Sequence, residues 1–152
     1  MEATRPAVPK VAGLLGILGL IPFAVPVLGA LVAAPAWHDV LARALLAYGA
    51  VILSFLGGVQ WGLAAAGGTP GADRPGTADR YVVSVIPSLI GWSALLMPFP
   101  IGVWTLIAAF GWILIVDLRA TAHGFAPDWY PRLRIPLSGA VMLLLAAGAV
   151  VY

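Results

Sequence analysis

The chain of 152 residues has no cysteine and few charged residues, since acidic and basic side chains make up only 9% of the sequence. A soluble domain carries about 25% charged residues, so this chain lacks the polar side chains needed to cover a water-facing surface. The absence of cysteine excludes disulfides, thiolate catalysis and cysteine-ligated metal centres. The formal net charge is only +2, too small for the basic patch of a nucleic-acid-binding domain. A soluble globular enzyme and a nucleic-acid-binding module are therefore excluded.

What the chain has instead is long apolar stretches. Hydrophobic residues make up 62% of the sequence, and the mean hydropathy is +1.02. A helix needs about 20 apolar residues to cross a bilayer. The uncharged stretch between Arg80 and Asp117 is too long for one helix, and the prolines of Met97-Pro98-Phe99-Pro100 predict its break. The sequence predicts one all-α transmembrane domain over residues 1–152, a compact bundle of five transmembrane helices at about 10–33, 40–66, 81–97, 101–117 and 134–151.

The basic residues are unevenly distributed over this topology. With five spans, one side of the membrane carries every lysine and arginine except Arg43. Cytoplasmic loops are enriched in basic residues, so we expect a cytoplasmic N-terminus and an external C-terminus, in a multi-pass protein of the bacterial inner (plasma) membrane. The sequence is also tryptophan-rich, with six tryptophans expected mainly near the two interfaces. A cleaved signal peptide over residues 1–36 is the alternative for the first span, although its apolar stretch is longer than a signal-peptide core.

The remaining polar residues give little support for catalysis. The only lysine, Lys10, lies outside the spans, which excludes a retinal or pyridoxal Schiff base within them. The two histidines, His38 and His123, are expected on opposite sides of the membrane and cannot share a metal or haem. Asp117 and Asp128 are too weak a pattern for an interfacial metal enzyme, and no acidic residue lies at mid-membrane to relay protons. We expect no catalytic residues, no metal and no cofactor, and an enzyme is the least favoured class.

Small residues recur every fourth position in the second span, at Ser54, Gly58 and Gly62. Helices in lipid pack through close backbone approach at small residues, because lipid supplies no hydrophobic drive between them. This face is therefore predicted to pack against another helix. The partner is another helix of the same chain, a second copy in a homodimer, or a ligand.

Polar residues are expected to gather in the cytoplasmic half of the bundle. Gln60 is the most polar residue within a span and must find a hydrogen-bonding partner there. It is either bonded to a neighbouring helix or part of a pocket. The candidate ligand-binding residues form a polar wedge that is open to the cytoplasm. Its polar side chains are Gln60, Ser84, Ser88 and Asp117. Two tryptophans, Trp61 and Trp92, are its apolar walls, and two arginines, Arg80 and Arg134, are placed to meet an anionic head group.

Several of these residues lie in blocks that resemble a known family. The blocks are Tyr48-Gly49-Ala50 through Gln60-Trp61-Gly62, Ile86-Pro87-Ser88-Leu89-Ile90-Gly91-Trp92, Asp117, and Trp129-Tyr130-Pro131 with Leu133-Arg134 and Leu137-Ser138. Together they resemble, over roughly residues 41–140, the uncharacterised family typified by mitochondrial transmembrane protein 69, which also occurs in bacterial inner membranes. The resemblance implies a small multi-helix membrane domain and names no substrate.

The sequence thus favours a non-enzymatic binder or carrier of a small apolar or amphipathic ligand, such as a lipid, isoprenoid or quinone. The expected partners are membrane lipid and that ligand, with no nucleic acid. The alternative is a structural or assembly subunit that packs, as a homo-oligomer or in a membrane complex, through the Ser54/Gly58/Gly62 face. Ion or proton conduction is disfavoured because no ionisable residue lies at mid-membrane.

Overall fold

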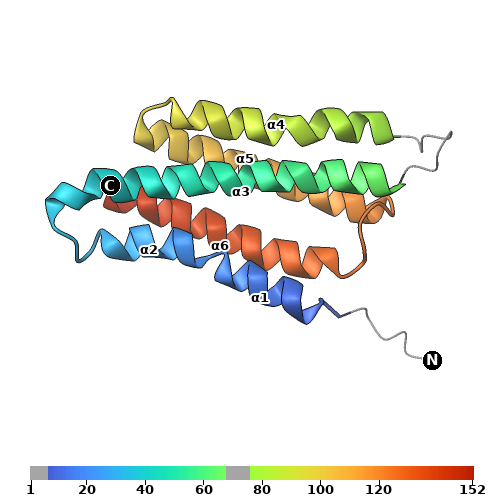
Figure 1. The fold of residues 1–152 in the computed structure, drawn as a ribbon, viewed down its shortest axis with the longest axis horizontal. Coiled ribbons are helices and arrows are strands. Elements are labelled where there is room, and N and C mark those ends of the chain that lie inside the picture. Colours follow the sequence, from blue (N-terminus) through green and yellow to red (C-terminus); the bar gives the residue numbers. More distant parts are fainter. Residues whose placement is uncertain (1–6, 68–75) are drawn as a thin grey trace.

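The computed structural model describes residues 7–67 and 76–152, and this part of the chain is helical with no strand (Figure 1). Neighbouring long helices run antiparallel. The elements in chain order are α1 (Lys10–Leu18), α2 (Ile21–Gly29), the 3₁₀ helix η1 (Pro35–Trp37), α3 (His38–Gly67), α4 (Thr77–Leu95), α5 (Phe99–Ala122) and α6 (Tyr130–Val151).

The helices have the length and composition of a membrane domain. Four segments of the described chain are long and apolar enough to cross a bilayer: Lys10–Gly29, Pro35–Ala66, Phe99–Ala122 and Tyr130–Val151. The remaining long helix, α4, has 19 residues, carries Asp79 and Arg80 near its start, and packs against α3 and α5. The predicted all-α membrane fold is confirmed, and the chain is an integral membrane protein.

The first segment, expected as one helix over 10–33, is divided into α1 and α2. Pro22 explains the break, because proline has no N–H to donate to the carbonyl of Leu18 and its ring clashes with that carbonyl. In α2 the same proline lies in the first turn, where helical N–H groups have no partner in any case. The hydroxyl of Tyr48 in α3 donates to the carbonyl oxygen of Gly19 at 3.2 Å, which satisfies a backbone group at the break.

The second break lies where the prolines predicted it. Helix α4 ends at Leu95 and α5 begins at Phe99, with Pro98 as the residue before the helix and Pro100 in its first turn. Both prolines occupy positions that a helix start tolerates, so the chain reverses direction within a few residues. This turn separates the two helices that the uncharged stretch between Arg80 and Asp117 contains.

The core lies between α2, α3, α5 and α6. Phe23 of α2 is fully buried and meets Tyr48 and Phe110 edge to face, with ring centroids 4.9 Å and 6.3 Å apart. Edge-to-face contacts add to the dispersion energy of such a core. Helices α3 and α4 approach closely at Gly91, where an added Cβ would come within 3.1 Å of the Ala50 carbonyl oxygen.

The two ends of the bundle differ in charge. At one end Tyr152 donates to the carbonyl oxygen of Pro26 at 2.6 Å, and its ring contacts His38 and Phe99. The basic residues of the described chain other than Arg43 lie at the opposite end, where α1 and α6 begin; they are Lys10, Arg80, Arg119, Arg132 and Arg134. Arg5 and Arg74, which the topology predicts on the same side of the membrane, fall outside the described residues.

Candidate functional site

Four polar side chains from four helices form one hydrogen-bonded chain inside the basic end of the bundle. The Gln60 side chain of α3 donates from Nε2 to Asp117 Oδ1 of α5 at 2.6 Å. Arg80 of α4 donates from Nη1 to Gln60 Oε1 at 2.8 Å. Arg134 of α6 donates from Nε to Asp117 Oδ2 at 2.5 Å. We call Arg80, Gln60, Asp117 and Arg134 the polar network.

The polar network is buried at its centre. Gln60 and Asp117 are both 0% exposed, and Arg134 is 7% exposed. A buried carboxylate is tolerated in apolar surroundings only when charged and polar partners surround it, which two donors from different helices provide here. The guanidinium of Arg80 is held further by the ring of Phe125, whose centroid lies 3.9 Å from Cζ. The network therefore fixes the relative positions of α3, α4, α5 and α6.

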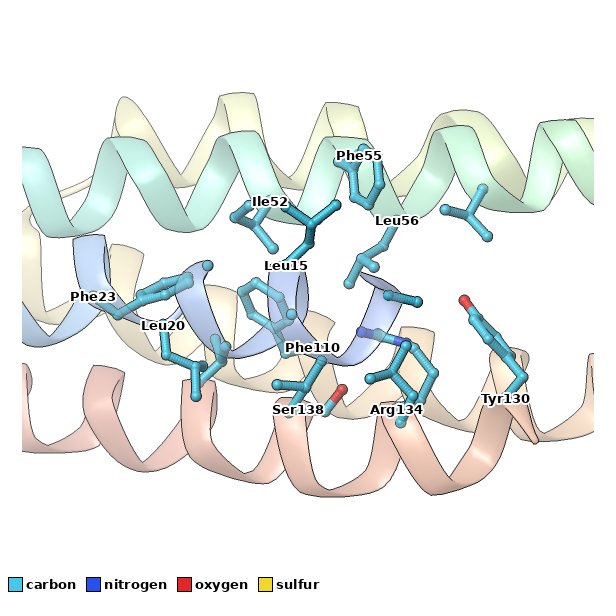
Figure 2. Close-up of a pocket in the computed structure, with 17 residues that line it drawn as sticks. Leu15, Leu20, Phe23, Ile52, Phe55, Leu56, Phe110, Tyr130, Arg134 and Ser138 are labelled. Atoms are coloured by element: carbon cyan, nitrogen blue, oxygen red, sulfur yellow. The ribbon is translucent and has the colours of Figure 1, made fainter. Parts of the chain in front are cut away.

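A cleft of about 380 Å³ lies beside this network, between α1, α2, α3 and α6. Its volume is within the range of small-molecule sites, near the lower end. Figure 2 shows Ile52, Phe55 and Leu56 of α3 on one side, facing α6 on the other. Phe110 of α5 and Leu15 of α1 complete the apolar lining. The wall is therefore mainly aliphatic and aromatic.

The polar side chains that line this cleft within the described chain all come from α6: Tyr130, Arg134 and Ser138. Arg134 Nη2 and Ser138 Oγ are buried and have no hydrogen-bond partner among the described residues. The Tyr130 hydroxyl interacts with the Asp117 carboxylate but completes no well-formed hydrogen bond there. Buried polar groups are nearly always hydrogen-bonded, so unsatisfied donors beside a cavity indicate a missing partner.

Helix α1 forms the loosest wall of the cleft. None of its residues is buried, and its packing contacts are with α6. Gly16 of α1 lies against Leu137 of α6, so close that an added Cβ would come within 2.5 Å of Leu137 Cδ1. The break at Gly19 and Leu20 separates α1 from the buried start of α2. Helix α1 is therefore joined to the bundle mainly through α6, and the rest of its surface is exposed.

The structure brings only part of the predicted polar wedge together. Gln60, Asp117, Arg80 and Arg134 meet as described, and the interhelical bonding that was one alternative for Gln60 is observed. Ser84 instead donates to the carbonyl oxygen of Tyr81 in its own helix, and it lies at the α3–α4 contact. Ser88 is half-buried on α4 and does not line the cleft.

The two predicted tryptophan walls lie on the outer surface of the bundle. Trp61 is 53% exposed and stacks edge to face on Tyr81, with ring centroids 4.8 Å apart. Trp92 is 62% exposed. Neither lines the cleft, because their positions on α3 and α4 point away from α1 and α6. Their exposure fits contact with lipid, and the apolar walls of the site come from other residues.

Of the predicted packing face, Gly58 and Gly62 meet no other helix of the described chain, whereas Ser54 is half-buried. A Cβ added at Gly58 or Gly62 would meet nothing within 4 Å. The close helix contact forms at Gly57, where an added Cβ would collide with the Ser84 carbonyl oxygen. This corrects the expected intramolecular contact by one residue. In a helix one residue corresponds to a rotation of about 100°, so Gly58 and Gly62 turn outward.

Sequence reasoning missed Ser138 and Tyr130 as site residues. The available signal was the spacing of Arg134 and Ser138, which are four residues apart and therefore share one face of α6. That face points inward in the structure, where both residues are buried. In an apolar helix, two polar residues on one face indicate a polar contact or a ligand, and only the fold shows that Arg134 Nη2 and Ser138 Oγ lack partners.

A second cavity of about 340 Å³ lies at the basic end between α4 and α5. Arg80, Arg119, His123 and Asp79 line it. Arg80 thus belongs to the polar network and also lines this cavity. Within the described residues, no group of three or more histidine, cysteine or acidic side chains could hold a metal ion.

Comparison with known proteins identifies the family. The family described as "Protein of unknown function (DUF3429)" matches residues 8–150. Transmembrane protein 69 of Xenopus tropicalis is 34% identical over 131 residues, which cover 86% of this chain and 50% of that protein. Transmembrane protein 69 of Mus musculus is 35% identical over 129 residues, which cover 84% of this chain and 50% of that protein. No solved structure matches the chain.

The chain spans about half the length of the curated relatives it matches. The match includes the segments that carry Gln60, Asp117 and Arg134, since the family covers nearly all of the sequence. The resemblance inferred from the sequence blocks is confirmed. The chain belongs to the DUF3429 family of proteins of unknown function, and proteins named transmembrane protein 69 are among its relatives.

Proposed function

We propose that the protein is a non-enzymatic binder or carrier of a small amphipathic ligand of the membrane, such as a lipid, an isoprenoid or a quinone. The ligand lies in the cleft between α1, α2, α3 and α6, with its polar group against α6. The observation that carries the proposal is the pairing of an apolar cleft of about 380 Å³ with two buried, unsatisfied donors, Arg134 Nη2 and Ser138 Oγ.

The arrangement fits an amphipathic molecule better than a polar one. The apolar lining offers no hydrogen bonds along most of its length, whereas Arg134 and Ser138 offer donors beside the polar network. Small-molecule sites combine these two features, a mainly hydrophobic wall and a few placed polar groups that fix the orientation. The exposed α1 supplies a wall through which a molecule dissolved in the bilayer enters sideways.

The proposed setting is the bacterial inner membrane, with the basic end of the bundle at the cytoplasm. This orientation rests on the positive-inside rule and on the position of Lys10, Arg80 and Arg132 at one end. The polar group of the ligand then lies in the cytoplasmic half of the membrane, because Arg134 is near the start of α6.

Native mass spectrometry of protein purified in a neutral detergent tests the proposal. We expect the wild-type protein to retain a small molecule that organic extraction then releases. Val59→Trp places a large ring in the cleft and should abolish retention. Val51→Trp is the matched control, because Val51 lies on the same helix, is 61% exposed and does not line the cleft.

Equal retention by both variants would overturn the proposed site. The proposal also fails if wild-type protein carries no molecule and neither a long-chain fatty acid nor a short-chain quinone raises its melting temperature. Ligand that binds the folded state alone must stabilise it, so the melting temperature is an independent measurement of binding.

A second candidate function, as a structural or assembly subunit packing through the Ser54/Gly58/Gly62 face, is favoured by the outward-facing Gly58 and Gly62. Gly58 and Gly62 have open space around them, so a second helix of another chain can approach there. Gly58→Leu should then disrupt a larger complex in crosslinked native membranes while the single chain stays folded. A protein that is monomeric in such membranes contradicts this candidate.

A further inference from the structure

Resting on the proposed function, we infer that the ligand is a single-chain amphiphile with an anionic oxygen head group, a carboxylate or a phosphate monoester, bound by Arg134 and Ser138. The head group accepts hydrogen bonds from Arg134 Nη2 and Ser138 Oγ, and the chain lies along the apolar cleft. The inference follows from the kind of donors, the charge beside them and the size of the cleft.

The unsatisfied Arg134 Nη2 requires a hydrogen-bond acceptor in the ligand. A guanidinium can only donate hydrogen bonds, so whatever satisfies Arg134 Nη2 must be an acceptor. Ser138 lies one helical turn further along α6 on the same face. The residue is 1% exposed, and its hydroxyl has no hydrogen-bond partner among the described residues. Two donors side by side on one helix suit the two oxygens of a carboxylate or phosphate group.

The guanidinium is also held in place before any ligand arrives. Arg134 Nε is bonded to Asp117 Oδ2, and Asp117 is in turn fixed by Gln60. The side chain of Arg134 is 9% exposed, so water reaches it poorly. Because the planar guanidinium cannot rotate without breaking the bond to Asp117, Nη2 keeps a fixed direction in the site.

The charge around the site favours an anion over a neutral acceptor. The polar network holds two guanidiniums, Arg80 and Arg134, and one carboxylate, Asp117. The network therefore carries a formal net charge of +1, and Asp117, its only carboxylate, lies with Arg134 in its buried part while Arg80 is half-buried. Asp79 and Arg119, which line the second cavity together with Arg80, carry opposite charges and add no net charge there. An anionic head group beside Arg134 balances the network.

The apolar part of the cleft fits one chain. Its volume of about 380 Å³ is near the lower end of the range for small-molecule sites, about 300–1,000 Å³. Leu15, Ile52, Phe55 and Phe110 bound this space from three helices. A space of this size suits one aliphatic chain better than the two chains of a diacyl lipid.

A binding series with one chain and different head groups tests the inference. The probes are hexadecanoate, hexadecyl phosphate, hexadecan-1-ol and decylubiquinone, added to the full chain in neutral detergent and measured by native mass spectrometry and melting temperature. We expect the two anions to bind at least about tenfold more tightly than the alcohol or the quinone, since hydrogen bonds to charged groups are the stronger ones.

Ser138→Ala should weaken hexadecanoate binding by about tenfold and leave hexadecan-1-ol binding less affected. Ser54→Ala is the matched control, because its hydroxyl donates only to the Ala50 carbonyl oxygen at 2.8 Å and lies outside the cleft. Ser138→Thr, which keeps the hydroxyl, should restore affinity for hexadecanoate relative to Ser138→Ala. Removing one buried hydroxyl leaves the polar network intact, so all three variants should fold.

The outcomes separate this inference from the proposed function. Equal binding of all four probes, with no effect of Ser138→Ala but loss on Val59→Trp, overturns the anionic head group and retains the cleft as the site. Tighter binding of decylubiquinone than of hexadecanoate overturns it in favour of a neutral carbonyl ligand. Binding of none of the probes, with Val59→Trp equal to Val51→Trp, overturns both.

Discussion

Arg134 of α6 donates to Asp117 of α5 through Nε at 2.5 Å, while Nη2 of the same guanidinium remains without a partner beside the apolar cleft. One side chain thus belongs both to the polar network that ties the helices together and to the candidate ligand site. A buried ion pair is a weak source of stability by itself, because desolvation offsets most of the attraction. Its double position gives Arg134 a role that packing alone does not explain.

We expect the Asp117–Arg134 pair to show strong coupling. Asp117→Ala leaves Arg134 buried without its counter-charge and should lower the free energy of unfolding by about 3–5 kcal/mol. The double variant Asp117→Leu/Arg134→Met should lose less free energy of unfolding than the sum of the losses in Asp117→Leu and in Arg134→Met, because neither charge is then left without its partner. Reversible unfolding in mixed micelles measures this double-mutant cycle. Additive effects within about 0.5 kcal/mol would show that the two side chains do not interact.

Gln60 should matter more than its neutral side chain suggests. Gln60→Leu removes the partner of both Asp117 Oδ1 and Arg80 Nη1, and the cost of unsatisfied buried groups is about 1–3 kcal/mol. We expect a corresponding fall in the free energy of unfolding, measured under the same conditions. Ser54→Ala, which removes only a bond within α3, should change it by less than about 0.5 kcal/mol. Similar losses for the two variants contradict the polar network.

Two adjacent glycines of α3 should respond oppositely to the same substitution. Gly57→Ala forces a methyl group against the Ser84 carbonyl oxygen and within 3.2 Å of Pro87 Cγ, so α3 and α4 must separate. Overpacking of this kind costs about 1–3 kcal/mol. Gly58→Ala meets open space and should be neutral or stabilise the helix by up to about 1 kcal/mol. Thermal unfolding of the two variants compares them directly, and a larger loss at Gly58 would place the contact on the other face.

The absence of cysteine allows the orientation to be measured with single substitutions. Trp37→Cys and Met97→Cys lie at the end of the bundle away from the arginine-rich one, whereas Asp79→Cys and His123→Cys lie at the arginine-rich end. In spheroplasts, an impermeant maleimide should label the first two variants from outside. The other two should react only after the membrane is opened. Labelling in the reverse order would invert the proposed orientation, and mixed labelling within one pair would contradict the bundle.

Part of the site was predictable because polar side chains in hydrocarbon need hydrogen-bonding partners from neighbouring helices. Gln60, Asp117, Arg80 and Arg134 were predicted to lie together from their positions near one end of their helices, and they form one hydrogen-bonded chain. Their depth along the helix axis follows from counting residues at 1.5 Å each. Which direction each side chain points depends on the rotation of the helix, and hydropathy does not define it in a uniformly apolar helix.

That missing rotation explains the differences between expectation and structure. Gly58 and Gly62 turned out to face outward, Gly57 makes the contact with α4, and Trp61 and Trp92 lie on the surface. A soluble helix reveals its buried side through its polar side, but these helices are apolar on all sides, so the pattern carries little directional information. Small residues mark a possible contact without stating which of two adjacent glycines makes it.

The sequence by itself determined that this protein is a helical membrane domain, where its chain reverses, and which end carries the basic residues, because charge, proline and length each have a direct energetic cost in a bilayer. Only the tertiary structure decided that Arg134 and Ser138 share a cleft with α1 and α3 and that two of their donors are unsatisfied. Whether a buried group has a partner depends on the packing of several helices at once. The presence of a partner depends on distances between segments that are far apart in the chain, so it cannot be inferred from the sequence of any one segment.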